Sequence, residues 1–354
     1  MNTNKITSIV FGLMISLSMS CAEQEDISSS VPAITNQKGA VNGNTAASIG
    51  LVGDAGDVSR QTEPGTVLMG GGADVDEAIE WMIDRSGGGD FVVLRASGGD
   101  GYNDYIYGLG NVNSVETLLI DSRSLANNSG VETAIRNAEA VFIAGGDQYD
   151  YVSFWKDTKV ESALNYLINT KEVPVGGTSA GCAIQGEAYF DAANGTVYSN
   201  EALRNPYNSY MSLQEGNFLD VPYLESVITD THYDNPDRRG RHITFMARMN
   251  KDWGMNAKGI GVDEATAVCI DENGRGYVFG DGTAFFLNQN GQGPERCQNR
   301  KSLDWYRNRQ AIRAHLIQGN SQGNRYFNLA SWSPGSGESS QYYYVDRGRL
   351  KTSN

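Results

Sequence analysis

Gly177-Thr178-Ser179-Ala180-Gly181 decides the fold, because it is a G-x-S-x-G pattern placed between a short apolar run and small residues that can begin a helix. Glycines flank a serine where a sharp strand-to-helix turn leaves no room for a Cβ. Such a turn lifts the Ser179 hydroxyl off the sheet edge. It also directs the N–H of Ala180 to the place where an oxyanion forms. The competing interpretation is a tight turn in which the serine only caps a helix.

Short apolar runs alternate with helix-like stretches from about residue 48 onward. The predicted strands are 66–69, 91–94, 117–120, 140–143, 173–176, 227–229, 267–270 and 276–279. The predicted helices are 74–84, 131–138 and 160–168. This alternation predicts an α/β fold with a mainly parallel sheet and helices on both faces. An Asn-Gly turn between the last two strands predicts an appended β-hairpin, and the tail from 333 is either an edge strand or a docked tail.

Composition sets the class of protein. The chain has 354 residues, is 40% apolar, and carries a formal net charge of −14. It is therefore long and apolar enough to bury a large core. Because phosphate binding needs a basic face, the negative charge argues against a nucleic-acid partner.

The N-terminus predicts export. Residues 1–20 hold Lys5 and a short apolar segment, and the small residue before Cys21 resembles a bacterial lipoprotein signal. We therefore expect a lipid on Cys21, a flexible tether over 21–48 and the folded domain over 49–354. The protein would be anchored by the lipid alone to the bacterial envelope, at the outer membrane or cell surface. A soluble exported protein is the alternative.

The remaining cysteines leave one question open. Export implies an oxidising compartment, and Cys269 and Cys297 could pair, but the odd count does not decide it. Cys182, one turn beyond Ser179, is expected to pack as a small apolar residue. No cysteine has metal-ligand spacing with a histidine, so no metal is expected.

A serine nucleophile needs a base, and the chain has only three histidines. His232 follows the strand at 227–229, where the ends of parallel strands face an active-site crevice. His242 is expected in a helix that Asn235 caps and Pro236 opens, and His315 in a helix over 311–317. His232 is therefore the candidate base, although a structural role is the alternative.

An orienting carboxylate would complete the site. Asp263 and Glu264 share a loop before a strand, and the residues alone do not decide between them or exclude a solvated pair. The chain order serine, histidine, acid differs from that of α/β-hydrolases, chymotrypsin and subtilisin. If the elbow is catalytic, the fold is none of these three.

Two glycine clusters follow predicted strands. Gly145 or Gly146 could supply a second oxyanion donor, and the adjacent Gln148 could bind substrate. The run 70–72 lacks the features of a nucleotide loop. It is interpreted as a turn that lets the next helix pack on the sheet.

Four stretches in order resemble the cyanophycinase and aspartyl dipeptidase family of serine peptidases: FIAGGDQ at 142–148, GGTSAG at 176–181, DTHY…DRRGR at 230–241 and GIGVDEATA at 259–267. The similarity extends from about 66 to 282. It implies a three-layer α/β sandwich like that of class I glutamine amidotransferases, with no cofactor. It also leaves a homodimer open.

The resemblance assigns roles to residues of this chain. It implies that Ser179 is the nucleophile, His232 the general base and Glu264 the orienting acid. The implied oxyanion hole is Gly145, Gly146 and Ala180, and the implied substrate-binding residues are Gln148, Asp230, Thr231, Arg238 and Arg241.

The implied activity is a serine exopeptidase that hydrolyses cyanophycin, a polyaspartate with β-linked arginines, to β-Asp-Arg dipeptides through an acyl-enzyme. Two departures from the family pattern bear on specificity. Pro236 stands where many members have an arginine, and Thr231 replaces a glutamine. The alternatives are an aspartyl or isoaspartyl dipeptidase of the same family and a non-catalytic, lipid-anchored binding protein.

Overall fold

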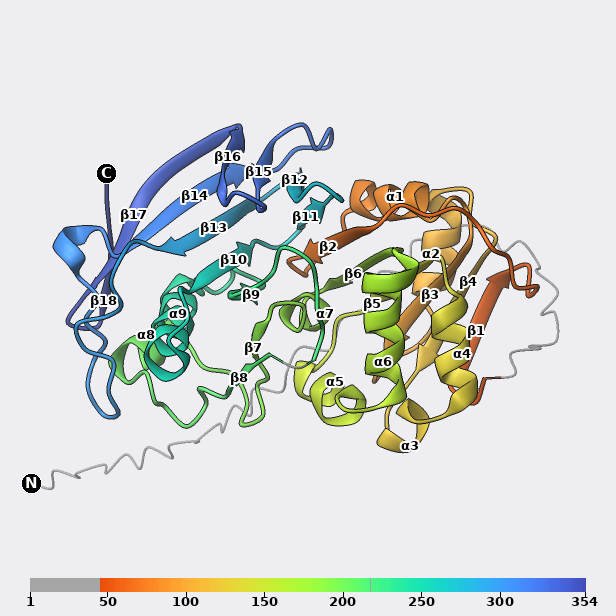
Figure 1. Cartoon of the computed structure of the whole chain (residues 1–354), viewed down its shortest axis with the longest axis horizontal. Coiled ribbons are helices and arrows are strands. Elements are labelled where there is room, and N and C mark those ends of the chain that lie inside the picture. Colours follow the sequence, from red (N-terminus) through yellow and green to blue (C-terminus); the bar gives the residue numbers. More distant parts are fainter. Residues whose placement is uncertain (1–44, 217) are drawn as a thin grey trace, which may run out of the picture. The chain divides into compact units, whose positions relative to one another are not determined.

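The computed structural model describes residues 45–216 and 218–354 (Figure 1). These residues belong to one unit of the chain, Val41–Asn354. The predicted signal peptide at 1–20, the lipidation site Cys21 and most of the predicted tether at 21–48 fall outside the described residues and stay predictions. No helix within the two described ranges is long and apolar enough to cross a membrane.

A 10-stranded sheet carries the serine elbow. In spatial order its strands are β1 (Ser48–Gly53), β4 (Ser114–Leu119), β3 (Asp90–Arg95), β5 (Ala140–Ile143), β6 (Pro174–Thr178), β2 (Gly65–Met69), β11 (Thr266–Ile270), β12 (Arg275–Gly280), β15 (Tyr326–Asn328) and β16 (Ser333–Ser336). The strands from β4 through β2 in this order run parallel. Their side chains are buried in continuous runs, as expected for strands covered on both faces.

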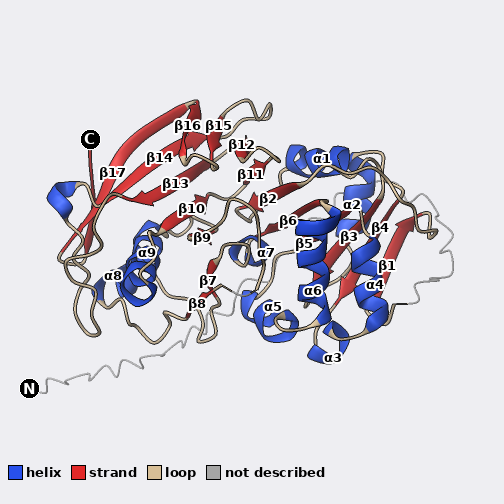
Figure 2. Ribbon diagram, viewed as in Figure 1, coloured by secondary structure: helices blue, strands red, loops and turns tan. Residues whose placement is uncertain are grey.

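Helices cover both faces of these parallel strands (Figure 2). One face carries α1 (Asp76–Arg85) and α2 (Tyr102–Leu109), and the other carries α3 (Arg123–Ala126), α4 (Ser129–Asn137), α5 (Gln148–Trp155), α6 (Lys159–Tyr166) and the π-helix η1 (Leu167–Lys171). Alternate residues of β3 point to the two faces. Phe91 and Val93 pack with α1 and α2, whereas Val92 and Leu94 pack with α4 and α6.

An 8-stranded sheet holds the second part of the site. In spatial order its strands are β18 (Arg349–Ser353), β17 (Glu338–Asp346), β14 (Ile312–Gln318), β13 (Thr283–Gln289), β10 (Lys258–Val262), β9 (Val227–Asp230), β7 (Ala188–Phe190) and β8 (Leu213–Glu215). The remaining helices are α7 (Ala180–Ala183), α8 (Ser199–Arg204), α9 (Arg239–Trp253) and the 3₁₀ turn η2 (Arg307–Arg309). A core shared by α8, α9, β13 and β14 includes Leu203, Phe245, Leu287 and Ile312.

The α/β class is confirmed, but the prediction of a mainly parallel sheet is wrong beyond the central strands. On the far side of β2, the pairs β2–β11, β11–β12, β12–β15 and β15–β16 are all antiparallel. The second sheet is parallel only between β7, β9 and β10. Sequence alternation identified the parallel strands of the 10-stranded sheet. It missed strands such as β13 and β14, which are antiparallel neighbours with no α-helical crossover between them.

Two local predictions are also wrong, and one question that the sequence left open is answered. His315 lies on β14 and not in a helix, because Ile312, Ala314 and Ile317 are buried within a strand. Helix α9 begins at Arg239, so Asn235 is not its cap. Cys269 and Cys297 are free and buried in different cores, so the disulfide left open by the sequence is not formed.

Candidate active site

The serine elbow depends on very close backbone approaches. Ser179 joins β6 to α7 with φ 51° and ψ −113°, a strained conformation for a residue with a Cβ. A Cβ on Gly177 would lie 2.6 Å from the carbonyl carbon of Gly181, and one on Gly181 would lie 2.2 Å from the Ile143 oxygen. Neither position can accept a larger residue without moving backbone, which explains why glycines flank the serine.

Three side chains from separate parts of the chain form one hydrogen-bonded series. Ser179 Oγ lies 2.8 Å from His232 Nε2, and His232 Nδ1 lies 2.6 Å from Glu264 Oε1. With Nδ1–H donating to the carboxylate, Nε2 is left as an acceptor for the serine hydroxyl proton. His232 lies two residues beyond the end of β9 at Asp230, and Glu264 lies in the loop between β10 and β11. The structure therefore brings together the three residues that sequence reasoning selected.

Asp263, the other acid of that loop, points elsewhere. Its Oδ2 accepts a hydrogen bond of 3.0 Å from the Thr283 N–H, and its side chain is buried. Burial raises its pKa to about 6, because the charged form loses hydration. Glu264, and not Asp263, contacts the imidazole of His232, which decides the choice that the residues alone left open.

Asp263 should make stability depend on pH. Its folded pKa of about 6 exceeds the unfolded value of 3.8, so the native state holds this proton more tightly. The contribution of Asp263 to the free energy of unfolding should therefore fall as pH rises from about 4 to about 6, by up to roughly 3 kcal/mol. Asp263→Asn is neutral throughout and keeps an acceptor for Thr283, so its stability relative to the wild type should rise over that range. Urea unfolding across pH checks this, and a difference that stays constant with pH would contradict it.

Asp230 and Arg241, two predicted substrate-binding residues, bind each other. The Arg241 guanidinium donates from Nε to Asp230 Oδ2 at 2.9 Å and from Nη2 to Oδ1 at 2.5 Å. Both side chains are buried: that of Arg241 is 4% exposed and that of Asp230 is 3% exposed. Burial alone would raise the pKa of Asp230, but the Arg241 cation outweighs it and lowers that pKa. The pair holds the backbone next to His232, since Asp230 Oδ1 also accepts from the Thr231 N–H.

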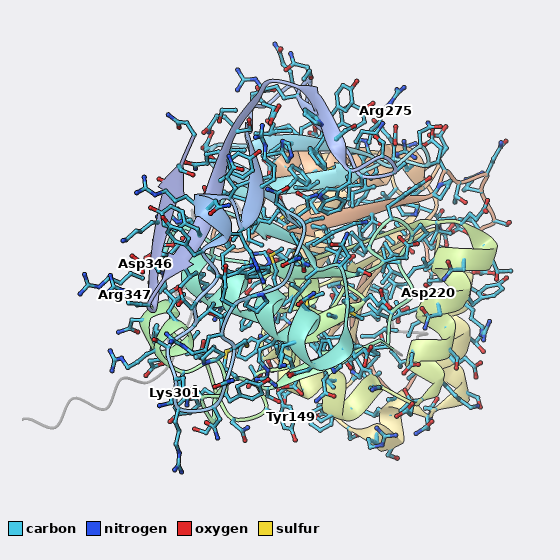
Figure 3. All side chains as sticks on the ribbon, turned by 60° about the vertical axis from the view of Figure 1, so that its left-hand side comes forward. Tyr149, Asp220, Arg275, Lys301, Asp346 and Arg347 are labelled. Atoms are coloured by element: carbon cyan, nitrogen blue, oxygen red, sulfur yellow. The ribbon has the colours of Figure 1, made fainter. Side chains whose placement is uncertain are left out.

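Breaking this pair should be costly. Arg241→Met leaves a carboxylate buried without its cation, so we expect about 3–5 kcal/mol of lost unfolding free energy. Arg347→Met is the matched control, because Arg347 and its partner Asp346 lie at the surface (Figure 3) and Arg347 is 80% exposed. The control should change stability by less than about 0.5 kcal/mol. If urea unfolding showed equal losses of unfolding free energy in both variants, the buried Asp230–Arg241 pair would not be the stabilising contact described above.

Two of the predicted oxyanion residues, Gly145 and Ala180, lie next to Ser179. A Cβ on Gly145 would lie 3.6 Å from the Ser179 Cβ, so this glycine faces the nucleophile. The Tyr151 hydroxyl contacts the Ala144 and Gly145 carbonyl oxygens at 2.8 and 3.0 Å and holds that turn. Ala180 is buried and begins α7, whereas Gly146 is exposed.

Gln148 and Arg238 are partly exposed. The amide of Gln148 donates to the Phe190 carbonyl at 3.3 Å, and Arg238 Nη1 donates to the carbonyl of the buried Thr231 at 3.2 Å. Burial and the neighbouring Arg241 lower the pKa of Arg238 to about 10, so it remains a cation at neutral pH.

The remaining histidines lie outside the site. His242 is buried with its ring nitrogens 3.0 Å from the Tyr233 hydroxyl and 3.1 Å from the Ile228 oxygen, and burial lowers its pKa. His315 contacts Glu338. Among the described residues, no group of three or more histidine, cysteine or acidic side chains is arranged to hold a metal ion.

Sequence reasoning missed the role of the glycine run after β2. These glycines do more than let the next helix pack. Gly71 lies directly against His232, and Gly72 lies directly against Glu264. The signal was present as three consecutive glycines at a strand end, but their partners lie about 160–190 residues later in the chain.

Comparisons with known proteins show similarity to a family of peptidases. Residues 111–276 match the sequence profile of Peptidase family S51. A cyanophycinase of Nostoc sp. (strain PCC 7120) is 30% identical over 169 residues, covering 48% of this chain and 51% of the relative. A cyanophycinase of Synechococcus elongatus is 29% identical over 182 residues, or 51% of each chain. The chain thus spans about half the length of these curated relatives.

A solved structure of a peptidase from an acI-B1 Actinobacterium aligns with a TM-score of 0.46 and 16% identity, covering 63% of this chain and 90% of that one. The family profile and the cyanophycinases, and not this structure, confirm the resemblance predicted from the four sequence blocks.

Proposed function

We propose that this chain is a serine-type exopeptidase that hydrolyses cyanophycin to β-Asp-Arg dipeptides. The observation that carries the proposal is the hydrogen-bonded series Ser179–His232–Glu264, on a strained elbow, in a chain similar to a peptidase family. Parallel strands with helices on both faces support the further proposal that the fold is a glutaminase-like sandwich.

The proposed reaction has two steps. His232 Nε2 takes the hydroxyl proton as Ser179 Oγ attacks the peptide carbonyl, and the Glu264 carboxylate stabilises the imidazolium that forms. The N–H groups of Ala180 and of Gly145 or Gly146 bind the oxyanion. His232 then protonates the leaving amine, and water activated by the same imidazole hydrolyses the acyl-enzyme.

The proposed substrate contacts divide into two groups. Arg238 is partly exposed and cationic, so we assign it to a substrate carboxylate. Gln148 is also partly exposed and is assigned to a hydrogen bond with substrate. Three of the predicted substrate residues are buried: Asp230, Thr231 and Arg241. We assign them to supporting the backbone next to His232 rather than to direct contact with substrate. With proline at position 236, one cation fewer is present to bind the carboxylates of the linked arginines. An aspartyl or isoaspartyl dipeptidase is therefore the second candidate.

The deciding experiment incubates the full chain with purified cyanophycin and with a panel of aspartyl and isoaspartyl dipeptides, and identifies the products by mass spectrometry. Release of β-Asp-Arg from cyanophycin, absent with Ser179→Ala, supports the first proposal. Cleavage of dipeptides alone selects the second candidate. Cleavage of neither substrate, together with no labelling by a fluorophosphonate, favours a non-catalytic binding protein.

The location of the protein remains a proposal from the N-terminal sequence. We propose a lipoprotein modified at Cys21 and anchored to the bacterial envelope by the lipid, where it would degrade external polymer. Metabolic labelling with a palmitate analogue, lost in Cys21→Ser, tests this.

A further inference from the structure

A single short segment contacts the backbone of all three triad regions. Three successive carbonyls at the end of β2 each accept one hydrogen bond. Met69 O accepts from Ser179 N at 3.0 Å, and Gly70 O accepts from His232 N at 2.7 Å. Gly71 O accepts at 3.0 Å from the N–H of Ala265, the residue after Glu264. The three triad residues, which come from separate parts of the chain, thus share one reference segment.

The side-chain space next to this segment is also filled by the triad. Gly71 has φ +95°, and a Cβ there would lie 2.5 Å from His232 Nε2 and 2.6 Å from Cε1. Gly72 has φ +72°, and its Cβ would lie 3.0 Å from the Glu264 Cβ. A Cβ on Gly70 would meet the Asp263 carbonyl oxygen at 2.0 Å. Both the backbone conformation and the contacts therefore require glycine.

We propose that residues 69–72 form a positioning segment for the triad. The carbonyls of residues 69–71 fix where the backbones of Ser179, His232 and the residue after Glu264 lie. The missing side chains of Gly71 and Gly72 leave the space that the His232 ring and the Glu264 side chain occupy. The inference rests on the proposed function, because it concerns the geometry of that same site. The segment touches no reacting atom except through His232, so it positions the base and does not itself catalyse.

The main test is Gly71→Ala. The substitution keeps the carbonyl but places a methyl group against the face of the imidazole, so His232 must move away from Ser179 Oγ. Since misplacement by about 1 Å can cost about 10²-fold, we expect kcat to fall at least that far with KM unchanged. The matched control is Gly291→Ala, which has φ +80° with nothing within 4 Å of its Cβ. It carries the same backbone strain and should leave kcat unchanged.

A spectroscopic measurement separates positioning from activity. A proton held between His232 Nδ1 and Glu264 should give a far-downfield proton NMR signal, assigned by its loss in His232→Ala. The signal from the His315–Glu338 contact serves as an internal reference. We expect Gly71→Ala to lose the His232 signal and keep the reference, and Gly291→Ala to keep both. Since this measurement needs no substrate, it decides the inference even if the wild type hydrolyses no peptide.

Two results would overturn the inference. One is Gly71→Ala with the His232 signal intact and kcat within twofold of the wild type. If Gly71→Ala does not fold, Gly72→Ala replaces it, because its Cβ contact with Glu264 is looser. The inference then requires the His232 signal to weaken and kcat to fall. The second overturning result is therefore a Gly72→Ala variant in which neither the His232 signal nor kcat changes.

Discussion

Ser179→Ala should lower kcat by about 10⁴–10⁶-fold, with little change in KM or in stability. The hydroxyl is the only group in the series that can form the acyl-enzyme, whereas the oxyanion donors and substrate contacts remain. Among residues 45–216 and 218–354, the removed oxygen is hydrogen-bonded only to His232, so the fold should tolerate its loss. Steady-state hydrolysis of the substrate found with the wild type gives both constants.

Ser331→Ala is the control for this substitution. Ser331 is exposed, and its hydroxyl hydrogen-bonds to that of Ser333. The control should match the wild type. A Ser179→Ala variant that retains more than about a hundredth of wild-type kcat would assign the nucleophile to another group.

Glu264→Gln should lower kcat by about 10⁴-fold while leaving the structure intact. The glutamine amide can donate to His232 Nδ1, and the imidazole then carries its proton on Nε2. In that tautomer Nε2 cannot accept the Ser179 proton, and no carboxylate stabilises the imidazolium. The expected pattern is a loss in kcat with an unchanged unfolding midpoint.

The neighbouring acid is the matched control for this change. Asp263→Asn alters the adjacent residue in the same way, but Asp263 hydrogen-bonds to Thr283 and not to the histidine. It should keep nearly full activity at neutral pH. If Asp263→Asn lost more activity than Glu264→Gln, Asp263 and not Glu264 would be the orienting acid.

The elbow and the base could be predicted from the sequence, because both depend on local pattern. A serine between glycines after a buried strand predicts a sharp turn at the carboxyl end of that strand. A histidine directly after another parallel strand is expected at the same sheet edge. With only three histidines in the chain, few alternatives existed. The choice of Glu264 over Asp263 came from the family resemblance, since adjacent acids in a loop give no local signal of direction.

Contacts between distant residues could not be predicted. Arg241 was expected to bind substrate, but its guanidinium is buried against Asp230, and no local pattern shows which partner a charged residue takes. His315 was assigned to a helix because a short apolar run fits either period, and the antiparallel partners that make it a strand come from elsewhere in the chain. Gly71 looked like a packing glycine, since its contact with His232 depends on the full fold.

The catalytic role of Ser179 and His232 is tested by covalent labelling with a fluorophosphonate, with the labelled residue mapped by peptide mass spectrometry in the wild type and in His232→Ala. We expect one adduct, on Ser179, and at the same exposure almost none in the variant, because the serine is nucleophilic only when the imidazole accepts its proton. An adduct on another residue, or equal labelling of Ser179 without the histidine, would contradict this role.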